Sequence, residues 1–181
     1  LSDIKNDSID RWYYQYSPHF DENVNKLFFT VREGGNLFDD ENIVTASLSN
    51  NYFTDFKPYI TLNSENNEGT PSFSDDGKFM VFTSCEMDFK NNSCDIYYSQ
   101  MIDNLWSRPR KFDDDINSAF WDSQPFMYEN KLYFVSNRPG GVGGRDIYYS
   151  VKNDDGSFSK ALNFREVNSE HEEVSPSVNN A

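Results

Sequence analysis

Acidic residues recur at one position of a repeated pattern in this chain. Glu68, Asp122 and Glu173 each stand three residues before a proline, and an Asn-Ser pair stands eight residues before the same proline. A looser first copy carries Gln15 at the acidic position. Carboxylates that lie together attract cations or basic side chains, so these acids are candidate binding residues. The alternative is structural: each acid accepts hydrogen bonds from its own turn or pairs with an arginine of the neighbouring repeat.

The two cysteines are candidates for a disulfide. Cys85 and Cys94 bracket the segment 86–93, which we expect to be a loop between two neighbouring strands. A hairpin would bring the two sulfurs together, and the closed loop would stabilise the fold by about 2–3 kcal/mol. The alternative is a pair of reduced, unrelated thiols. Two cysteines and two distant histidines do not form a recognisable zinc pattern, so no metal ligands are predicted.

The remaining polar clusters are best interpreted as loops. Residues 113–115 are three consecutive aspartates, which could bind Ca²⁺ but are more simply an acidic surface loop. The glycines of segment 140–144 lack the G-x-x-x-x-G-K-[ST] pattern, and they predict a tight connection between strands with positive φ angles. Asp95 and Asp146 are expected to accept hydrogen bonds from turn donors. No G-x-S-x-G elbow and no other catalytic set is present, so we expect no enzymatic activity and no cofactor.

Elements that position these residues repeat about every 50 residues. The prolines at positions 18, 71, 125 and 176 are separated by 53, 54 and 51 residues. Each interval holds short runs rich in aromatic and β-branched residues, bounded by Asp, Asn, Gly and Ser, which is typical of strands. No apolar 3.6-residue period persists, so almost no helix is expected. Four short strands per repeat predict an all-β fold, a β-propeller of four-stranded antiparallel blades, with inner strands near 17–20, 71–73 and 125–127.

Two sequence motifs resemble a known repeat. The run PSFSDDGKFMVFTS (71–84), followed by DIY, is similar to the TolB-type β-propeller repeat. The run FVSNRPGGVGGRDIYYS (134–150) resembles more particularly the propeller of OmpA-family envelope proteins of Bacteroidetes, which include PorE-like proteins of type IX secretion. The resemblance covers residues 12–181.

The resemblance implies how the chain is divided. Blades are expected at about 12–64, 65–118 and 119–169, with the start of a fourth at 170–181 and a preceding segment or closing strand at 1–11. Three full blades and part of a fourth do not close a ring, so we expect this sequence to belong to a longer protein. In such a fold, the segment before each proline crosses one face of the ring toward the central channel. The three acids would then form an arc of negative charge at the channel mouth.

Composition limits the partners. The chain has 30 acidic and 16 basic residues, a net charge of −14 and a pI near 4.4. Nucleic-acid binding depends on neutralising phosphates, so such a charge argues against it. No segment approaches the roughly 18 apolar residues that a membrane span needs.

Two functions remain open. The preferred one is a non-enzymatic interaction module of a bacterial envelope protein, periplasmic or associated with the outer membrane, within a secretion-associated, peptidoglycan-anchored complex. Its partners would be other envelope proteins. The alternative is the propeller domain of a secreted carbohydrate-active enzyme or peptidase, whose catalytic part lies outside this chain.

Overall fold

The protein is built from antiparallel strands. The computed structural model describes residues 12–35, 40–87 and 92–178, and no helix occurs among them. The segments 1–11 and 179–181, which include the expected preceding strand, lie outside the described residues. The strands are β1 (Tyr14–Asp21), β2 (Lys26–Arg32), β3 (Glu41–Ser49), β4 (Tyr52–Pro58), β5 (Asn67–Phe73), β6 (Phe79–Met87), β7 (Asn92–Ile102), β8 (Leu105–Trp106), β9 (Arg110–Lys111), β10 (Asp122–Tyr128), β11 (Lys131–Ser136), β12 (Asp146–Val151) and β13 (Leu162–Asn163).

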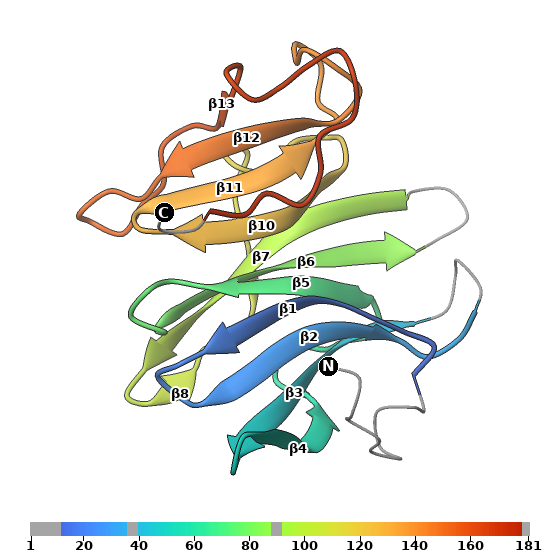
Figure 1. Cartoon of the computed structure of the whole chain (residues 1–181). Helices are drawn as coiled ribbons and strands as arrows, with labels where there is room; N and C mark the ends of the chain where they lie inside the picture. The colour runs from blue at the N-terminus through green and yellow to red at the C-terminus, as the bar shows by residue number, and fades with distance from the viewer. Residues whose placement is uncertain (1–11, 36–39, 88–91, 179–181) are drawn as a thin grey trace.

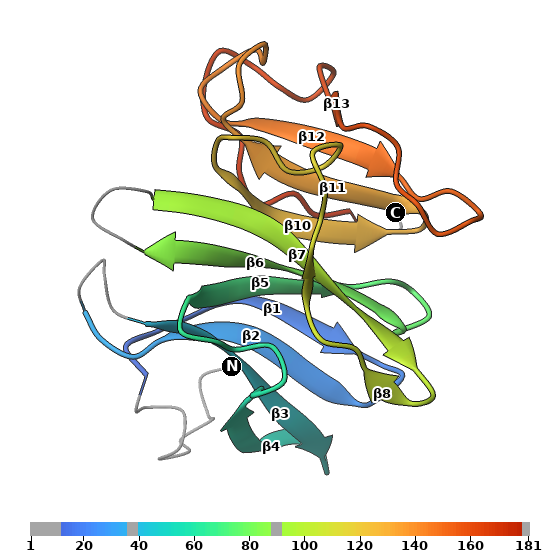
Figure 2. The same cartoon turned by 180° about the vertical axis from the view of Figure 1, so that it is seen from behind.

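Three consecutive sheets contain these strands. The first has the order β1-β2-β3-β4 and the third has the order β10-β11-β12-β13. The second has the order β5-β6-β7-β8, and β9 also pairs with β7. Figures 1 and 2 show the three sheets stacked in chain order, from blue to orange. The all-β prediction, with consecutive antiparallel sheets and inner strands that contain the prolines, is therefore confirmed.

The outer edge of the second sheet departs from the expected four strands. β8 pairs with residues 101–102 of β7, whereas β9 pairs with Tyr97 and Tyr98. Residues 107–109 separate the two short strands and include Pro109, which has no N–H to donate to a ladder. In the third sheet a single bridge between Lys152 and Phe158 takes the place of β8.

The hydrophobic core lies between neighbouring sheets. Buried side chains of the first and second sheets form one cluster, which includes Phe28, Ile43, Phe73 and Phe82. Side chains of the second and third sheets form another; its buried members are Phe79, Val81, Ile96, Phe112, Ile116, Met127, Leu132, Phe134 and Tyr148. Because each sheet buries a face against the next, the stability of one sheet depends on its neighbour.

Each inner strand contains a bulge at its proline. The register shifts between Tyr16 and His19 in β1, and at the matching positions of β5 and β10. The residue before each proline has a positive φ: 50° at Ser17, 51° at Thr70 and 54° at Gln124. Proline lacks the ladder donor, so a bulge is one of the few places in a strand that accommodates it.

Hydrogen bonds from these bulges connect the sheets. The backbone N–H of Thr70 donates to Thr30 Oγ1 at 2.8 Å, and that of Gln124 donates to Thr83 Oγ1 at 3.1 Å. The third sheet has Val135 at the threonine position, as its register with Ser123 shows, and valine has no hydroxyl. There the N–H of Ser175 donates instead to Gln124 Oε1 at 2.6 Å. Residues 170–178 therefore lie against the third sheet, although no strand is assigned to them.

The segment that leads from the outer edge of each sheet toward the next proline is called the linker. An asparagine fastens each linker to the third strand of its sheet. Asn117 Oδ1 accepts the N–H of Ile96 at 2.8 Å, and its Nδ2 donates to the Ile96 carbonyl at 3.0 Å. Asn63 and Asn168 make the same two bonds with Ile43 and Ile147. The amide replaces the partner strand for one residue, so these buried backbone groups are satisfied.

Replacing this amide should destabilise the protein. Asn117 is only 2% exposed and also donates to the Phe112 carbonyl. We expect Asn117→Ala to lower the free energy of unfolding by about 2–4 kcal/mol. It leaves the buried N–H of Ile96 and the carbonyl of Phe112 without the hydrogen bonds from Asn117, whereas the Ile96 carbonyl keeps the N–H of Phe112. Urea denaturation measures the loss. Asp114 is an exposed residue of the same linker. The control Asp114→Ala should change stability by less than about 0.5 kcal/mol, and equal effects of the two variants would contradict the structural role of Asn117.

Candidate functional site

The inner strands of the three sheets face a common channel. One cavity of about 310 Å³ lies among the bulges and is lined by Pro18, Pro71, Pro125 and Pro176 with their neighbours. The four proline repeats that are far apart in the sequence therefore meet along one axis. Glu68, Asp122 and Glu173 do not line this cavity, and they do not line the second cavity, which is described in the next paragraph.

A second cavity lies at the hairpin ends of the same strands. We call it the hairpin-end pocket; its volume is about 460 Å³ and its lining residues are His19, Phe20, Asp21, Glu22, Asn23, Phe73, Ser74, Asp75, Phe126, Met127 and Tyr128. Three acids and four aromatic side chains line one space, a combination that suits a cationic group. No sequence pattern predicted this pocket. Its only sequence signal was that aromatic residues closely follow the prolines at positions 18, 71 and 125.

The polar groups of the hairpin-end pocket are unevenly paired. Asp21 is 4% exposed, and its Oδ1 accepts hydrogen bonds from the backbone N–H and the side-chain Nδ2 of Asn23. Asp21 Oδ2 is buried and has no hydrogen-bond partner among the described residues. Burial lowers the pKa of His19, and the nearby Asp21 carboxylate opposes this shift. His19 packs against the Phe73 ring with centroids 5.0 Å apart, so the neutral imidazole is favoured there.

Two of the three acids of the predicted arc are buried, and Glu173 is half-buried. Glu68 is 1% exposed and Asp122 is 0% exposed, and their strands β5 and β10 belong to different sheets. Each of the three carboxylates accepts a backbone N–H and a hydroxyl from the serine four residues earlier, namely Ser64, Ser118 and Ser169. The spacing of acid and Asn-Ser pair therefore serves the linker, as the structural alternative expected. In the first repeat Gln15 donates to the Trp12 carbonyl instead.

Asp122 also has a cationic partner. Arg138 Nη2 donates to Asp122 Oδ1 at 2.6 Å, and its side chain is 15% exposed. The same Nη2 donates to the Ile116 carbonyl, and Nε donates to Ser136 Oγ. The arginine belongs to the same sheet as Asp122, not to the neighbouring one.

Glu68 has no such cation. Its carboxylate accepts hydrogen bonds from Ser64 and from Ser84 Oγ, and no ion pair involves it among the described residues. Burial raises the pKa of Glu68, and the serine hydrogen bonds oppose that rise. A buried carboxylate that is not paired with a cation can bind an external cation only where a cavity connects it to solvent.

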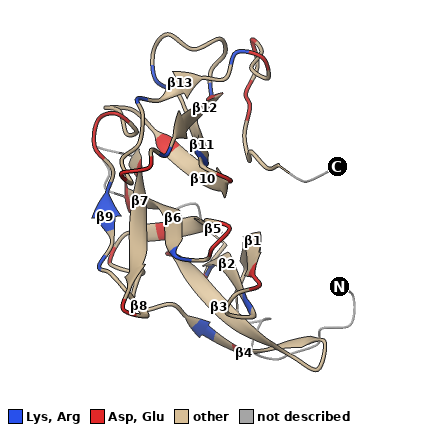
Figure 3. Ribbon diagram, turned by 90° about the vertical axis from the view of Figure 1, so that its left-hand side faces the viewer, with Lys and Arg blue, Asp and Glu red and all other residues tan. Residues whose placement is uncertain are grey.

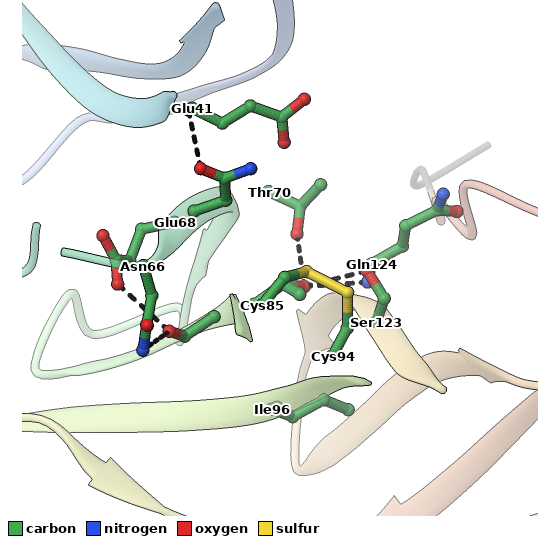
Figure 4. Close-up of a disulfide and its surroundings, with 12 residues drawn as sticks. Glu41, Asn66, Glu68, Thr70, Cys85, Cys94, Ile96, Ser123 and Gln124 are labelled. Atoms are coloured by element: carbon green, nitrogen blue, oxygen red, sulfur yellow. Dashed lines mark hydrogen bonds between the residues drawn. A yellow bond between two sulfur atoms is a disulfide. The ribbon is translucent and has the colours of Figure 1, made fainter. Parts of the chain in front are cut away.

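The cysteines form a disulfide in the structure. Cys85 and Cys94 are register partners in β6 and β7, with Cα atoms 4.0 Å apart and sulfurs joined (Figure 4). The strands extend beyond the cysteines to Met87 and Asn92, so the hairpin loop is shorter than the segment 86–93 that we expected. Residues 88–91 lie outside the described part.

The glycine-rich segment 140–144 wraps around a carboxylate. Asp146 Oδ2 accepts the N–H of Val142, and Asp146 Oδ1 accepts the N–H of Gly143, as the turn-donor prediction for Asp146 required. Within segment 140–144, a positive φ accounts for the glycine only at position 140, where φ is 91°. Gly141 is needed because a Cβ there would lie 1.8 Å from Asp146 Oδ2, and Gly143 because a Cβ would lie 2.1 Å from the His171 carbonyl oxygen. Asp95, in contrast, forms an ion pair with Lys111 at 2.6 Å.

Metal ligands are not gathered within the described residues. No group of three or more His, Cys, Asp or Glu side chains among them is placed to hold a metal ion. Asp113 Oδ1 accepts the N–H of Asp115, which ties the acidic loop to itself. Within the same ranges there is no helix of the length and apolarity that crossing a membrane requires.

Comparisons with known proteins show the fold. No protein-family model matches the sequence, and no curated protein matches it. The structure is similar to that of a TolB-like protein of Agrobacterium tumefaciens, with a TM-score of 0.53 and 16% identity over 84% of this chain and 50% of that one. A thermostable family-43 glycoside hydrolase gives a TM-score of 0.51 and 16% identity over 83% of this chain and 54% of that one.

A third similar structure is a puromycin-hydrolyzing peptidase of Mycobacterium tuberculosis. Its TM-score is 0.52 and its identity 14%, over 82% of this chain and 23% of that one. The chain thus spans about half the length of the first two structures and less of the third. These similarities identify the three sheets as blades of a β-propeller. Because the neighbours include both a TolB-like protein and two hydrolases, the fold does not decide between the two functions.

Replacing Arg138 alone should lower the free energy of unfolding more than replacing both members of its ion pair. Arg138→Leu leaves Asp122 charged, buried and without a cation, and we expect it to lower the free energy of unfolding by about 3–5 kcal/mol. The double variant Arg138→Leu/Asp122→Asn removes the charge and should recover part of that loss. Chemical denaturation of both variants measures the difference. A double variant no more stable than Arg138→Leu would contradict a charge-based role.

Reducing the disulfide should lower thermal stability. Cys85 and Cys94 are 9 residues apart, and the closure of such a loop corresponds to about 2–3 kcal/mol. We expect dithiothreitol to lower the thermal midpoint of the native protein by roughly 5–10 °C. Mass spectrometry of unreduced protein should show the bonded pair. The variant Cys85→Ser/Cys94→Ser should melt at the same temperature with and without reductant, and two free thiols in oxidised native protein would contradict the bond.

Proposed function

We propose that this chain is a non-enzymatic protein-interaction module whose hairpin-end pocket holds a basic segment of a partner protein. The observation that carries the proposal is the pairing of acids with aromatic walls in that pocket. Asp21 has a buried oxygen without a partner among the described residues, and Glu22 and Asp75 are exposed at the rim. A lysine or arginine side chain would supply the missing donor and a positive charge.

The charge of the whole chain supports a basic partner. The net charge is −14, and the acidic residues in Figure 3 gather largely in loops and turns. A field of one sign accelerates the approach of an oppositely charged protein and disfavours acidic ones. Aromatic rings such as Phe20 and Tyr128 would add cation–π attraction at the pocket itself.

The cellular setting of the proposal comes from the sequence resemblance. The repeats resemble TolB-type propellers and those of OmpA-family envelope proteins from Bacteroidetes. We therefore place the partner among proteins of the bacterial envelope, in the periplasm or at the outer membrane, within a complex associated with type IX secretion. A Ca²⁺ requirement is not part of the proposal.

A second function is favoured by the structural neighbours. Similarity to a glycoside hydrolase and a peptidase supports a propeller domain within a secreted hydrolase. The two candidates differ in what accompanies the propeller in the full-length gene product. A peptidoglycan-binding OmpA-like domain supports the interaction module, and a hydrolase domain supports the alternative.

Charge removal at the pocket rim tests the preferred function. The double variant Glu22→Gln/Asp75→Asn should weaken capture of a partner from envelope extract by about tenfold, because two exposed ion pairs would be lost. Affinity capture followed by mass spectrometry identifies the partner, and titration with that purified partner measures the affinity. Binding of the native protein should also fall at high salt.

A control with the same net charge makes this test specific. Asp103→Asn/Asp114→Asn neutralises two exposed acids outside the pocket. It should leave partner affinity nearly unchanged. If both double variants bind like the native protein, or both lose affinity equally, the hairpin-end pocket is not the binding site.

A further inference from the structure

One interior site can be compared across the three sheets, because strand register shows which residues are equivalent there. The register pairs Glu68 with Ser84 in the second sheet and Asp122 with Ser136 in the third. It also pairs Ser84 with Asp95 and Ser136 with Asp146. By position along the strands, Phe82 is equivalent to Phe134, and Tyr97 is equivalent to Tyr148. The two aromatic pairs have nearly the same geometry, with centroids 6.0 Å apart in both and interplanar angles of 31° and 25°.

In the third sheet an arginine of the chain occupies this position. The Arg138 guanidinium carbon lies 5.1 Å from the Phe134 ring centroid and 4.8 Å from that of Tyr148. The same group donates to the Asp122 carboxylate and to the Ile116 carbonyl. Carboxylate, two rings and a carbonyl together form a binding site for a guanidinium group, and the third sheet fills it from within.

In the first sheet a tryptophan fills the corresponding space. Gln15 pairs with Val31, so Gln15 matches the acidic position and Phe29 matches the first aromatic position. Trp12 is 4% exposed and packs edge-on against Phe29, with ring centroids 6.2 Å apart. The neutral amide of Gln15 accompanies an uncharged filler, so this sheet needs no cation.

The second sheet has the site without either filler. The position of Arg138 is occupied by Glu86, and the position of Trp12 by Glu65, both exposed. In their place lies a cavity of about 320 Å³, which we call the second-sheet cavity; its lining residues are Thr61, Leu62, Asn63, Ser64, Asn66, Glu68, Phe82, Ser84, Tyr97, Arg108 and Pro109. The cavity thus joins the Glu68 carboxylate to the Phe82–Tyr97 pair. Its size is at the lower end for ligand pockets in proteins.

We infer that the second-sheet cavity binds the guanidinium group of an arginine side chain supplied by a partner polypeptide. Arg138 shows, within the same fold, which contacts such a group makes. Glu68 offers a buried carboxylate without an ion pair among the described residues, and the exposed Thr61 and Ser64 leave the cavity open to solvent. Only the polypeptide origin of the arginine rests on the proposed function; the guanidinium site itself rests on the geometry.

Among the described residues, Arg108 is the one arginine that lines the cavity. It is exposed and forms no ion pair with Glu68 in the structure. If its side chain folded inward in solution, it would compete with an external arginine. The experiment therefore includes Arg108→Gln as a separate variant.

Binding of a small arginine derivative tests the site directly. The probe is N-acetyl-L-arginine amide, titrated into the whole chain and followed by NMR chemical shifts. We expect saturable binding that Glu68→Gln weakens by roughly tenfold or more, because a charge-assisted hydrogen bond is lost. The matched control Glu65→Gln changes an exposed neighbouring acid and should bind like the native protein. N-acetyl-L-lysine amide should bind more weakly, since an ammonium group cannot stack flat over the two rings.

A filled-site variant keeps the proposal falsifiable if Glu68→Gln is unstable. Residues 84 and 86 lie on the same face of β6, so Glu86→Arg places an arginine where it can reach Glu68. We expect Glu86→Arg to abolish probe binding and to raise the thermal midpoint by a few degrees, about 2–4 °C. Arg108→Gln should bind the probe as the native protein does.

Several outcomes would overturn the inference. They are unchanged probe binding in Glu86→Arg, equal binding of the lysine and arginine probes, absence of saturable binding to the native protein, and binding that appears only in Arg108→Gln. The result does not depend on the test of the hairpin-end pocket. Probe binding without any captured partner would keep the guanidinium site and reject the interaction function. A captured partner without probe binding would do the reverse.

Discussion

A carboxyl side chain buried near the start of an inner strand holds the linker between one blade and the next. The linker crosses from the outer edge to the central channel without a partner strand, so its backbone donors must find other acceptors. Glu68 and Asp122 provide them at the cost of burying a charge, and the serine four residues earlier supplies two donors to each carboxyl group. The preceding asparagine fastens the same linker to the third strand. The recurrent Asn-Ser and acid spacing therefore meets a requirement of linker geometry.

Differences between the repeats carry more information about binding than their common residues. A buried acid needs compensation, and each sheet handles the equivalent position in its own way: Gln15 with Trp12, Glu68 with a cavity, and Asp122 with Arg138. The hydrogen bond from each bulge to the neighbouring sheet also differs between repeats. Where Val135 lacks the hydroxyl of Thr30 and Thr83, the Gln124 side chain accepts the next bulge N–H. Such departures from the repeat mark positions where the chain meets a different neighbour.

The central channel concentrates residues that the linear sequence separates by about 50 positions. The proline bulges bring three inner strands together, and the hairpins beyond them place acids beside aromatic rings. A rigid stack of sheets that presents such residues at its ends is suited to holding a partner, and the same scaffold supports hydrolases elsewhere. The hairpin-end pocket and the second-sheet cavity share one preference, a cation beside aromatic rings. This common preference agrees with the strongly acidic composition of the chain.

The amino-acid sequence by itself determined the fold class, the repeat length and the strands that contain the prolines, because alternation of apolar residues and the choice of turn residues are local signals. It also placed Cys85 opposite Cys94, since hairpin register follows from neighbouring strands. It could not tell whether Glu68 and Asp122 were exposed, because burial depends on which side chains other strands bring to them. Only the tertiary structure decided that Arg138 covers one acid while a cavity adjoins the other, and that Asp21 joins the aromatic rings of β5 and β10. Contacts between distant residues create these environments, and no local pattern in the sequence specifies them.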